Sequence, residues 1–159
     1  MKRRAFIRNT SILAAGALAL PRIAYAAPAG EEAQLIYLSP IKSDGALSSC
    51  QAEVWFAQDA ADMYVVTAHD AWRAQAVKQG LSKTQVWVGD VGQWRGSSGA
   101  YKKLPALTAV ASQISEPSEY ARLLPKFGAK YTREWGTYGP RFKNGLADGS
   151  RVLLRYRPV

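Results

Sequence analysis

The sequence predicts an α+β fold that is mainly β. Short segments rich in β-branched and aromatic residues recur from residue 34 to the end of the chain. Only two or three stretches have helical spacing or helix-boundary residues. A length of 159 residues, with 48% hydrophobic and 21% charged residues, is typical of one globular domain. We expect three strands, a helix, two strands, a helical segment and a closing strand.

The first three strands are predicted from apolar runs and turn residues. Residues 34–38 (QLIYL) form the first strand, and the Asp-Gly pair at 44–45 marks a turn. Residues 48–57 form the second strand, with EVWFA as its apolar centre. A turn at 58–62 leads into the third strand, 63–67, so the second and third strands form a hairpin.

The segment 63–80 (MYVVTAHDAWRAQAVKQG) predicts a strand that runs into a helix. Asp70 is the expected N-cap, and Gly80 closes the helix in a left-handed conformation. The first turn then contains Ala71, Trp72 and Arg73. Free backbone N–H groups and the helix dipole attract anions, and Thr67 and Arg73 are expected to point toward the same spot. The segment is therefore a candidate phosphate site; the alternative is an ordinary junction with a solvated Arg73.

The second half of the chain contains the remaining strands and one predicted helix. Strands are expected at 84–90, 107–114 and 150–156. The segment 91–100, with several glycines and serines, is either a lid over a ligand or a plain hairpin tip. A helix runs from Pro117 to about residue 124, where Pro125 forces a kink or a fresh start.

Aromatic residues are frequent toward the C-terminus. Three aromatic residues and one leucine fall on one helical stripe, which we interpret as packing against the core: Tyr120, Leu124, Phe127 and Tyr131. The segment 133–145 mixes aromatic and basic residues, which favours either an anionic aromatic ligand or plain packing. Nucleic acid is not an expected partner.

The residue counts exclude several kinds of site. Cys50 is the only cysteine and His69 the only histidine, so a disulfide, a Cys-based metal cluster or a Ser-His-Asp triad is not expected. We interpret Cys50 as a small core residue. The net charge of +9 falls to +4 once the five basic residues of the first 26 positions are removed, which is weak support for a polyanionic partner.

Residues 1–26 have the pattern of an export signal. Paired arginines at positions 3 and 4, with Phe6 two positions on, resemble the twin-arginine motif, and a short apolar run and Ala24-Tyr25-Ala26 follow. We expect a partnership with the twin-arginine translocase, a periplasmic or otherwise exported protein, and no stable membrane anchoring after cleavage. The alternatives are a general secretory signal or an uncleaved anchor. The domain is then expected to span residues 33–159.

Four stretches carry a resemblance to known proteins: Asp44-Gly45, EVWF at 53–56, the segment 63–77 and VWVGD at 86–90. In this order they resemble the pyridoxamine 5′-phosphate oxidase-like flavin-binding proteins and the deazaflavin-dependent nitroreductase-like group. The resemblance implies a six-stranded antiparallel split β-barrel with two or three helices. It also implies a homodimer, because the family builds its cofactor sites between two subunits.

The resemblance further implies a cofactor and the residues that hold it. The flavin phosphate would be held by Thr67 and Arg73, although Ala71 and Trp72 stand where the family often has a small hydroxyl residue just before its basic pair. Trp55, Trp72 and Trp94 would stack on the isoalloxazine ring, or else belong to the core. FMN is the expected cofactor; a deazaflavin, a haem with His69 as its only available imidazole, or an empty site are the alternatives.

Two functions follow from the resemblance. The first is an exported oxidoreductase that transfers hydride or electrons to a small molecule, with the cofactor supplying the chemistry. The second is a non-catalytic binding module that holds haem, another small ligand or a protein partner. No residue stands out as a catalytic acid or base, and no metal site is expected.

Overall fold

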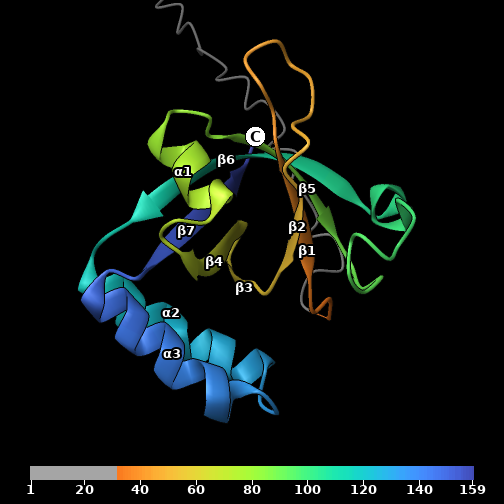
Figure 1. The fold of residues 1–159 in the computed structure, drawn as a ribbon. Coiled ribbons are helices and arrows are strands. Elements are labelled where there is room, and N and C mark those ends of the chain that lie inside the picture. Colours follow the sequence, from red (N-terminus) through yellow and green to blue (C-terminus); the bar gives the residue numbers. More distant parts are fainter. Residues whose placement is uncertain (1–31) are drawn as a thin grey trace, which may run out of the picture.

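The computed structural model describes residues 32–159, so the predicted export signal at 1–26 lies outside the described residues. This part of the chain contains one seven-stranded antiparallel sheet, three α-helices and a short 3₁₀ helix (Figure 1). The α+β class and the helix count are confirmed. The predicted number of six strands is wrong.

The elements follow one another in the order that the sequence predicts, with three additions: one strand, the 3₁₀ helix and α3. They are β1 (Ile36–Pro40), β2 (Ala52–Val54), β3 (Ala57–Asp59), β4 (Asp62–Ala68), α1 (Trp72–Lys78), β5 (Lys83–Val88), the 3₁₀ helix η1 (Ala100–Lys103), β6 (Ala106–Ile114), α2 (Pro117–Lys130), α3 (Trp135–Asp148) and β7 (Arg151–Pro158). The hairpin between β3 and β4 is confirmed, with Asp59 paired to Asp62.

The sheet curls into a barrel that is not fully closed by hydrogen bonds. Its strand order is β2-β1-β5-β6-β7-β4-β3, so β2 and β3 are the two edges. Only two residues, Trp55 and Phe56, separate these edges in the chain. Because two residues span less than about 10 Å, the two edges of the sheet are brought close together.

The extra strand arises because the predicted strand 48–57 is broken at Trp55 and Phe56. The backbone of Phe56 bonds to a side chain there: its N–H donates to the Tyr131 hydroxyl (2.8 Å), and that hydroxyl lies 3.0 Å from its carbonyl oxygen. A tyrosine from α2 thus satisfies backbone groups that a strand would otherwise pair. The chain passes from one sheet edge to the other at this point.

Alternate residues of the strands fill two cores on opposite faces of the sheet. Val65 of β4 and Leu154 of β7 belong to the barrel interior, which α1 covers through Ala74 and Val77. Val66 and Leu153 face the other way, toward α2 and α3. The helical stripe that runs from Tyr120 to Tyr131 packs in this second core, so its interpretation as packing is confirmed.

Two helix predictions need correction. Helix α2 does not end near Leu124 but continues through Pro125 to Lys130. The segment 133–145 forms most of α3, which was not predicted as a helix because glycine and Pro140 obscure its spacing. A Cβ on Gly128 or Gly139 would lie 2.8 Å from the Trp135 ring, so these glycines allow the indole to pack between α2 and α3.

The helices of the described chain are too short or too polar to cross a membrane.

Candidate functional site

Thr67 lies near the end of β4 and faces the barrel interior. It follows Val65 by two residues and pairs with Val152 of β7, which packs against the same core. The side chain is only 1% exposed, and its hydroxyl oxygen has no hydrogen-bond partner among the described residues. A buried hydroxyl without a partner is uncommon in a folded protein and costs about 1–3 kcal/mol.

The start of α1 differs from the prediction. The helix begins at Trp72, its N-cap is Ala71 in an extended conformation, and no side chain caps it. Asp70 is exposed and is not the N-cap. The Gln75 amide donates to the His69 carbonyl (2.7 Å) and fixes the turn that enters the helix. Since α1 has only seven residues, its dipole is a weak basis for an anion site, and side chains must supply the attraction.

The end of α1 agrees with the prediction. Gln79 is the C-cap and Gly80 follows it with φ of +84°. This left-handed conformation costs glycine little.

Arg73 is the second residue of α1 and is mostly buried. Its Nε atom is inaccessible and makes no hydrogen bond, and no ion pair to its guanidinium occurs within residues 32–159. Its one ring contact there is with Trp72, whose centroid lies 5.9 Å away. Burial lowers the pKa of Arg73, and Tyr156 and Glu53 oppose that shift. A buried cation is expensive unless it is paired, so this guanidinium is suited to an anionic ligand.

Tyr156 of β7 is the third polar group on this side of the barrel. It is 1% exposed and packs in the same interior core as Val65. Burial raises the pKa of its hydroxyl, and the nearby Arg73 guanidinium partly offsets that shift. Sequence reasoning missed this residue because the alternation of β7 predicts only that it is buried.

The three predicted tryptophans do not share one site in the described chain. Trp72 packs against the barrel interior. Trp55 belongs to the helical core, where it stacks on Tyr131 with ring centroids 4.3 Å apart and an interplanar angle of 7°. Trp94 packs in a third cluster with Tyr37 and Tyr101.

The segment 91–100, predicted as a lid or a hairpin tip, is attached to the barrel at two places. The Tyr37 hydroxyl donates to the Gly92 carbonyl (2.7 Å) and accepts from the Val91 N–H (3.0 Å). The Trp94 N–H donates to Glu53 (3.2 Å), and Arg95 lies over the Trp94 ring. Whether the segment covers a ligand remains a prediction.

The remaining candidate residues have simple surroundings. Cys50 is exposed in the loop between β1 and β2, so its prediction as a core residue is wrong. The His69 Nδ1 atom lies 3.2 Å from the Ser150 carbonyl oxygen, beside the entrance to α1. Within residues 32–159, no three His, Cys, Asp or Glu side chains come close enough together to bind a metal ion.

Comparison with known proteins identifies the fold. No family model and no curated protein matches the chain. Three solved structures resemble it: the haem storage protein HutZ of Vibrio cholerae, ChuZ of Campylobacter jejuni and a pyridoxamine 5′-phosphate oxidase-like protein of Listeria innocua. Their TM-scores are 0.57, 0.56 and 0.50, at identities of 15%, 10% and 15%.

The matches cover most of this chain but not always most of the other. The match to HutZ covers 81% of this chain and 84% of HutZ. The match to ChuZ covers 80% of this chain and 49% of ChuZ, and that to the Listeria protein covers 80% and 86%. The chain thus has the split-barrel fold of the pyridoxamine 5′-phosphate oxidase-like proteins, as its sequence resemblance implies. At these identities the likeness concerns the fold alone.

Proposed function

We propose that this protein binds FMN, with the cofactor phosphate held by Thr67 and Arg73. The observation that carries the proposal is the buried Arg73 guanidinium, which has no anionic partner among residues 32–159. The unpaired Thr67 hydroxyl on the same interior side of the barrel adds a neutral donor. Both groups are donors, and a phosphate offers only acceptors at neutral pH.

The described residues fit an anionic group in three respects. Arg73 supplies a fixed positive charge, because a guanidinium stays protonated even when burial lowers its pKa. Thr67 supplies a hydroxyl from the neighbouring strand, and its place in a regular ladder fixes its position. Tyr156 lies near Arg73 and contributes a further buried hydroxyl.

When bound, FMN would supply hydride or electron transfer to a small molecule. The chain's own residues would bind and orient the cofactor and exclude water from its phosphate. We assign none of them a proton-transfer role. We also propose that the protein is exported through the twin-arginine translocase and works as a homodimer.

The test is an absorption spectrum of the full chain, followed by FMN titration of the cofactor-free protein. We expect a flavin spectrum and saturable binding. Arg73→Ala should weaken FMN binding by about 1.5–3 kcal/mol, as for a hydrogen bond to a charged group. Arg133→Ala is the matched control, because Arg133 is exposed in the turn before α3. A protein that takes up neither FMN nor a deazaflavin contradicts the proposal, and equal affinity of the two variants removes Arg73 from the site.

Haem is the second candidate, because HutZ, which shares the fold, is a haem storage protein. A haem propionate is also an anion that a buried arginine would pair with. His69 is the only histidine in the chain and would have to supply the imidazole. A Soret band that is lost in His69→Ala would favour haem over FMN.

A further inference from the structure

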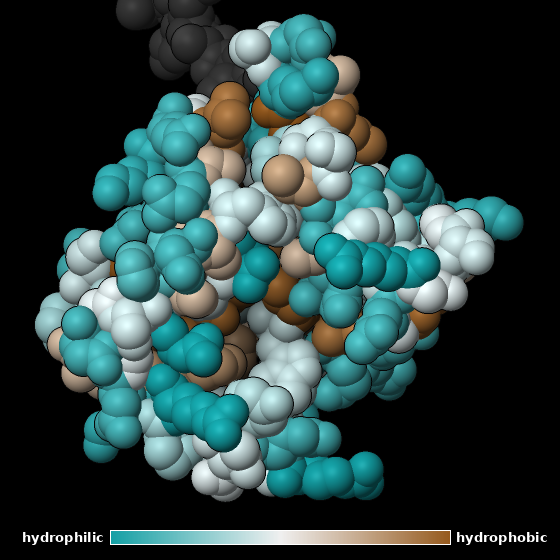
Figure 2. Space-filling view, in the orientation of Figure 1, coloured by the Kyte–Doolittle hydropathy of each residue, from teal (hydrophilic) through white to brown (hydrophobic). Residues whose placement is uncertain are grey.

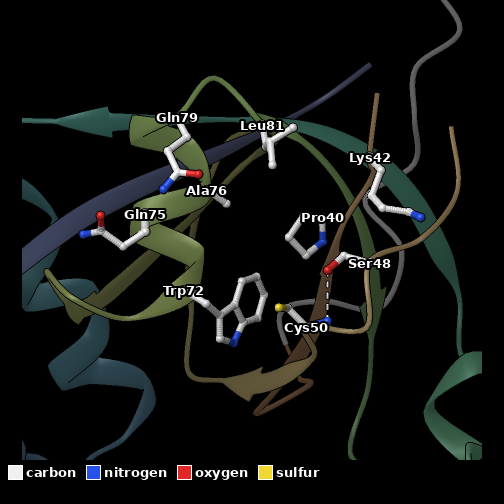
Figure 3. A pocket seen from close by; sticks show the side chains of 9 residues that line it. All are labelled: Pro40, Lys42, Ser48, Cys50, Trp72, Gln75, Ala76, Gln79 and Leu81. Atoms are coloured by element: carbon white, nitrogen blue, oxygen red, sulfur yellow. Dashed lines mark hydrogen bonds between the residues drawn. The ribbon is translucent and has the colours of Figure 1, made fainter. Parts of the chain in front are cut away.

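A cavity of about 360 Å³ lies between α1 and the loop that connects β1 to β2. Its walls include Trp72, Ala76 and Gln79 of α1, Leu81 after the helix, and Pro40 and Cys50 on the opposite side. Figure 3 shows the Trp72 indole and the Cys50 thiol directed toward each other across this space. In the space-filling view, hydrophobic residues lie at the surface between α1 and this loop (Figure 2). The volume falls within the range of small-molecule sites.

The cavity is lined by one face of α1, and Trp72 on that face also packs against the barrel interior and contacts Arg73. Trp72, Gln75, Ala76 and Gln79 recur at the spacing of one helix face, and all four line the cavity. Arg73 shares the other side with Val77, one helical turn later, and Val77 packs against the barrel interior. Arg73 itself is not among the residues that line the cavity.

The cavity continues toward two lysines. A second hollow of about 330 Å³ shares Lys42 and Leu81 with the first and adds Lys83. Neither set of lining residues contains an aspartate or glutamate. Lys42 lies 3.3 Å from Asp44, but this pair is exposed and such pairs contribute little. Lys83 is exposed and forms no ion pair within the described chain.

We propose that these two hollows form one binding site for a small amphiphile with a flat apolar body and an acidic group. The apolar body would pack on Trp72 and Leu81, because an indole face and an aliphatic side chain favour flat hydrophobic molecules. The acidic group would lie toward Lys42 and Lys83. The site does not depend on the proposed cofactor, and its ligand would be a substrate or a regulator of the protein.

The test uses the fluorescent probe 1-anilinonaphthalene-8-sulfonate on the folded, cofactor-free full chain, with the uncharged N-phenyl-1-naphthylamine as a matched probe. We expect one molecule of the sulfonate to bind per chain. Ala76→Trp should fill the apolar hollow and weaken both probes about tenfold or more. Changing Lys42 and Lys83 to Gln together should weaken only the sulfonate, by about three- to tenfold.

Two control variants make the outcomes decisive. Ala121→Trp fills a separate apolar hollow between α2 and α3, and should leave binding of both probes unchanged. Changing the exposed Lys102 and Lys103 to Gln removes the same charge elsewhere and should have no effect. The proposed site is wrong if Ala121→Trp loses binding of the probes. It is also wrong if Ala76→Trp binds them as tightly as the unmodified chain does. If the lysine variant loses the same affinity for both probes, the proposal that the ligand carries an acidic group is wrong.

A second measurement is independent of fluorescence. Cys50 is exposed and lines the apolar hollow, so bound sulfonate should slow its alkylation by iodoacetamide at least severalfold. The same protection should be absent in Ala76→Trp. An alkylation rate that the probe does not change contradicts binding at this place, even if FMN binds normally.

Discussion

Two buried polar side chains show how differently the two cores of this protein are built. The Tyr131 hydroxyl lies at the end of α2 and is fully engaged: it accepts from the Phe56 N–H and lies within 3.0 Å of the Gln34 and Phe56 carbonyl oxygens. The Arg73 guanidinium lies on the barrel side of the sheet and has no hydrogen bond or ion pair within the described chain. Both groups have lost most of their water.

The difference indicates what each group is for. A buried polar atom that its own chain satisfies contributes to the fold, here by joining α2 to the break between β2 and β3. A buried charge that its own chain leaves unpaired costs free energy, and a partner from outside the chain would offset that cost. The Tyr131 hydroxyl is thus satisfied by its own chain, whereas the barrel interior near Arg73 is suited to a ligand.

The largest expected effect is at Tyr131. Tyr131→Ala should lower the free energy of unfolding by about 3–5 kcal/mol, because it removes a buried aromatic ring that stacks on Trp55. Tyr131→Phe keeps the ring and isolates the hydroxyl, and should cost about 1–3 kcal/mol by leaving Phe56 unpaired. Urea unfolding of each variant measures both effects. A Phe variant as stable as the unmodified protein would mean that the hydroxyl is not a structural link.

Removing the charge of Arg73 should raise the free energy of unfolding, whereas the Tyr131 variants lower it. Arg73→Met keeps the apolar stem and removes the unpaired charge, so the cofactor-free protein should gain about 1 kcal/mol or more in unfolding free energy. The same change should weaken FMN binding. Urea unfolding without FMN and with saturating FMN separates the two effects, since ligand binding adds stability only where affinity remains. A destabilised Arg73→Met in the absence of ligand would assign Arg73 to the fold.

Much of the fold was predictable because it rests on local patterns. The valines and tyrosine of 63–67, the alternation in 150–156 and the glycine at position 80 each depend on short-range chemistry, and the structure contains β4, β7 and the end of α1 where they are expected. The break at Trp55 and Phe56 could not be predicted, because it depends on Tyr131, which is 75 residues away in the sequence. Helix α3 was missed because it contains Pro140 and three glycines, of which Gly139 makes room for the Trp135 ring.

The candidate site was only partly predictable, for similar reasons. Thr67 and Arg73 lie on adjoining elements, so the strand-to-helix spacing is enough to predict that they lie near each other. The contribution of Tyr156 depends on how β7 pairs with β4, which no local pattern reveals. The exposure of Cys50 likewise depends on the loop between β1 and β2 standing away from the core.

The smallest effect should come from a polar group that is paired but only partly buried. Such a group separates the effect of pairing from that of burial. Asp59 at the edge of the helical core pairs with Lys126 (3.0 Å) and with Arg122. Hydrogen bonds from Lys126 and Arg122 lower the pKa of Asp59, so its contribution to stability is present above the ordinary pKa near about 4 and lost as the pH falls through the lowered folded value.

Because solvent screens this exposed cluster, Asp59→Asn should cost less than about 1 kcal/mol at neutral pH. The difference from the unmodified protein should shrink between pH 5 and the acid limit of folding, which unfolding curves at several pH values will show. Asp70→Asn is the control, since Asp70 forms no ion pair among the described residues. A loss at Asp59 as large as that in Tyr131→Phe would mean that pairing alone, without burial, accounts for the stability of the helical core.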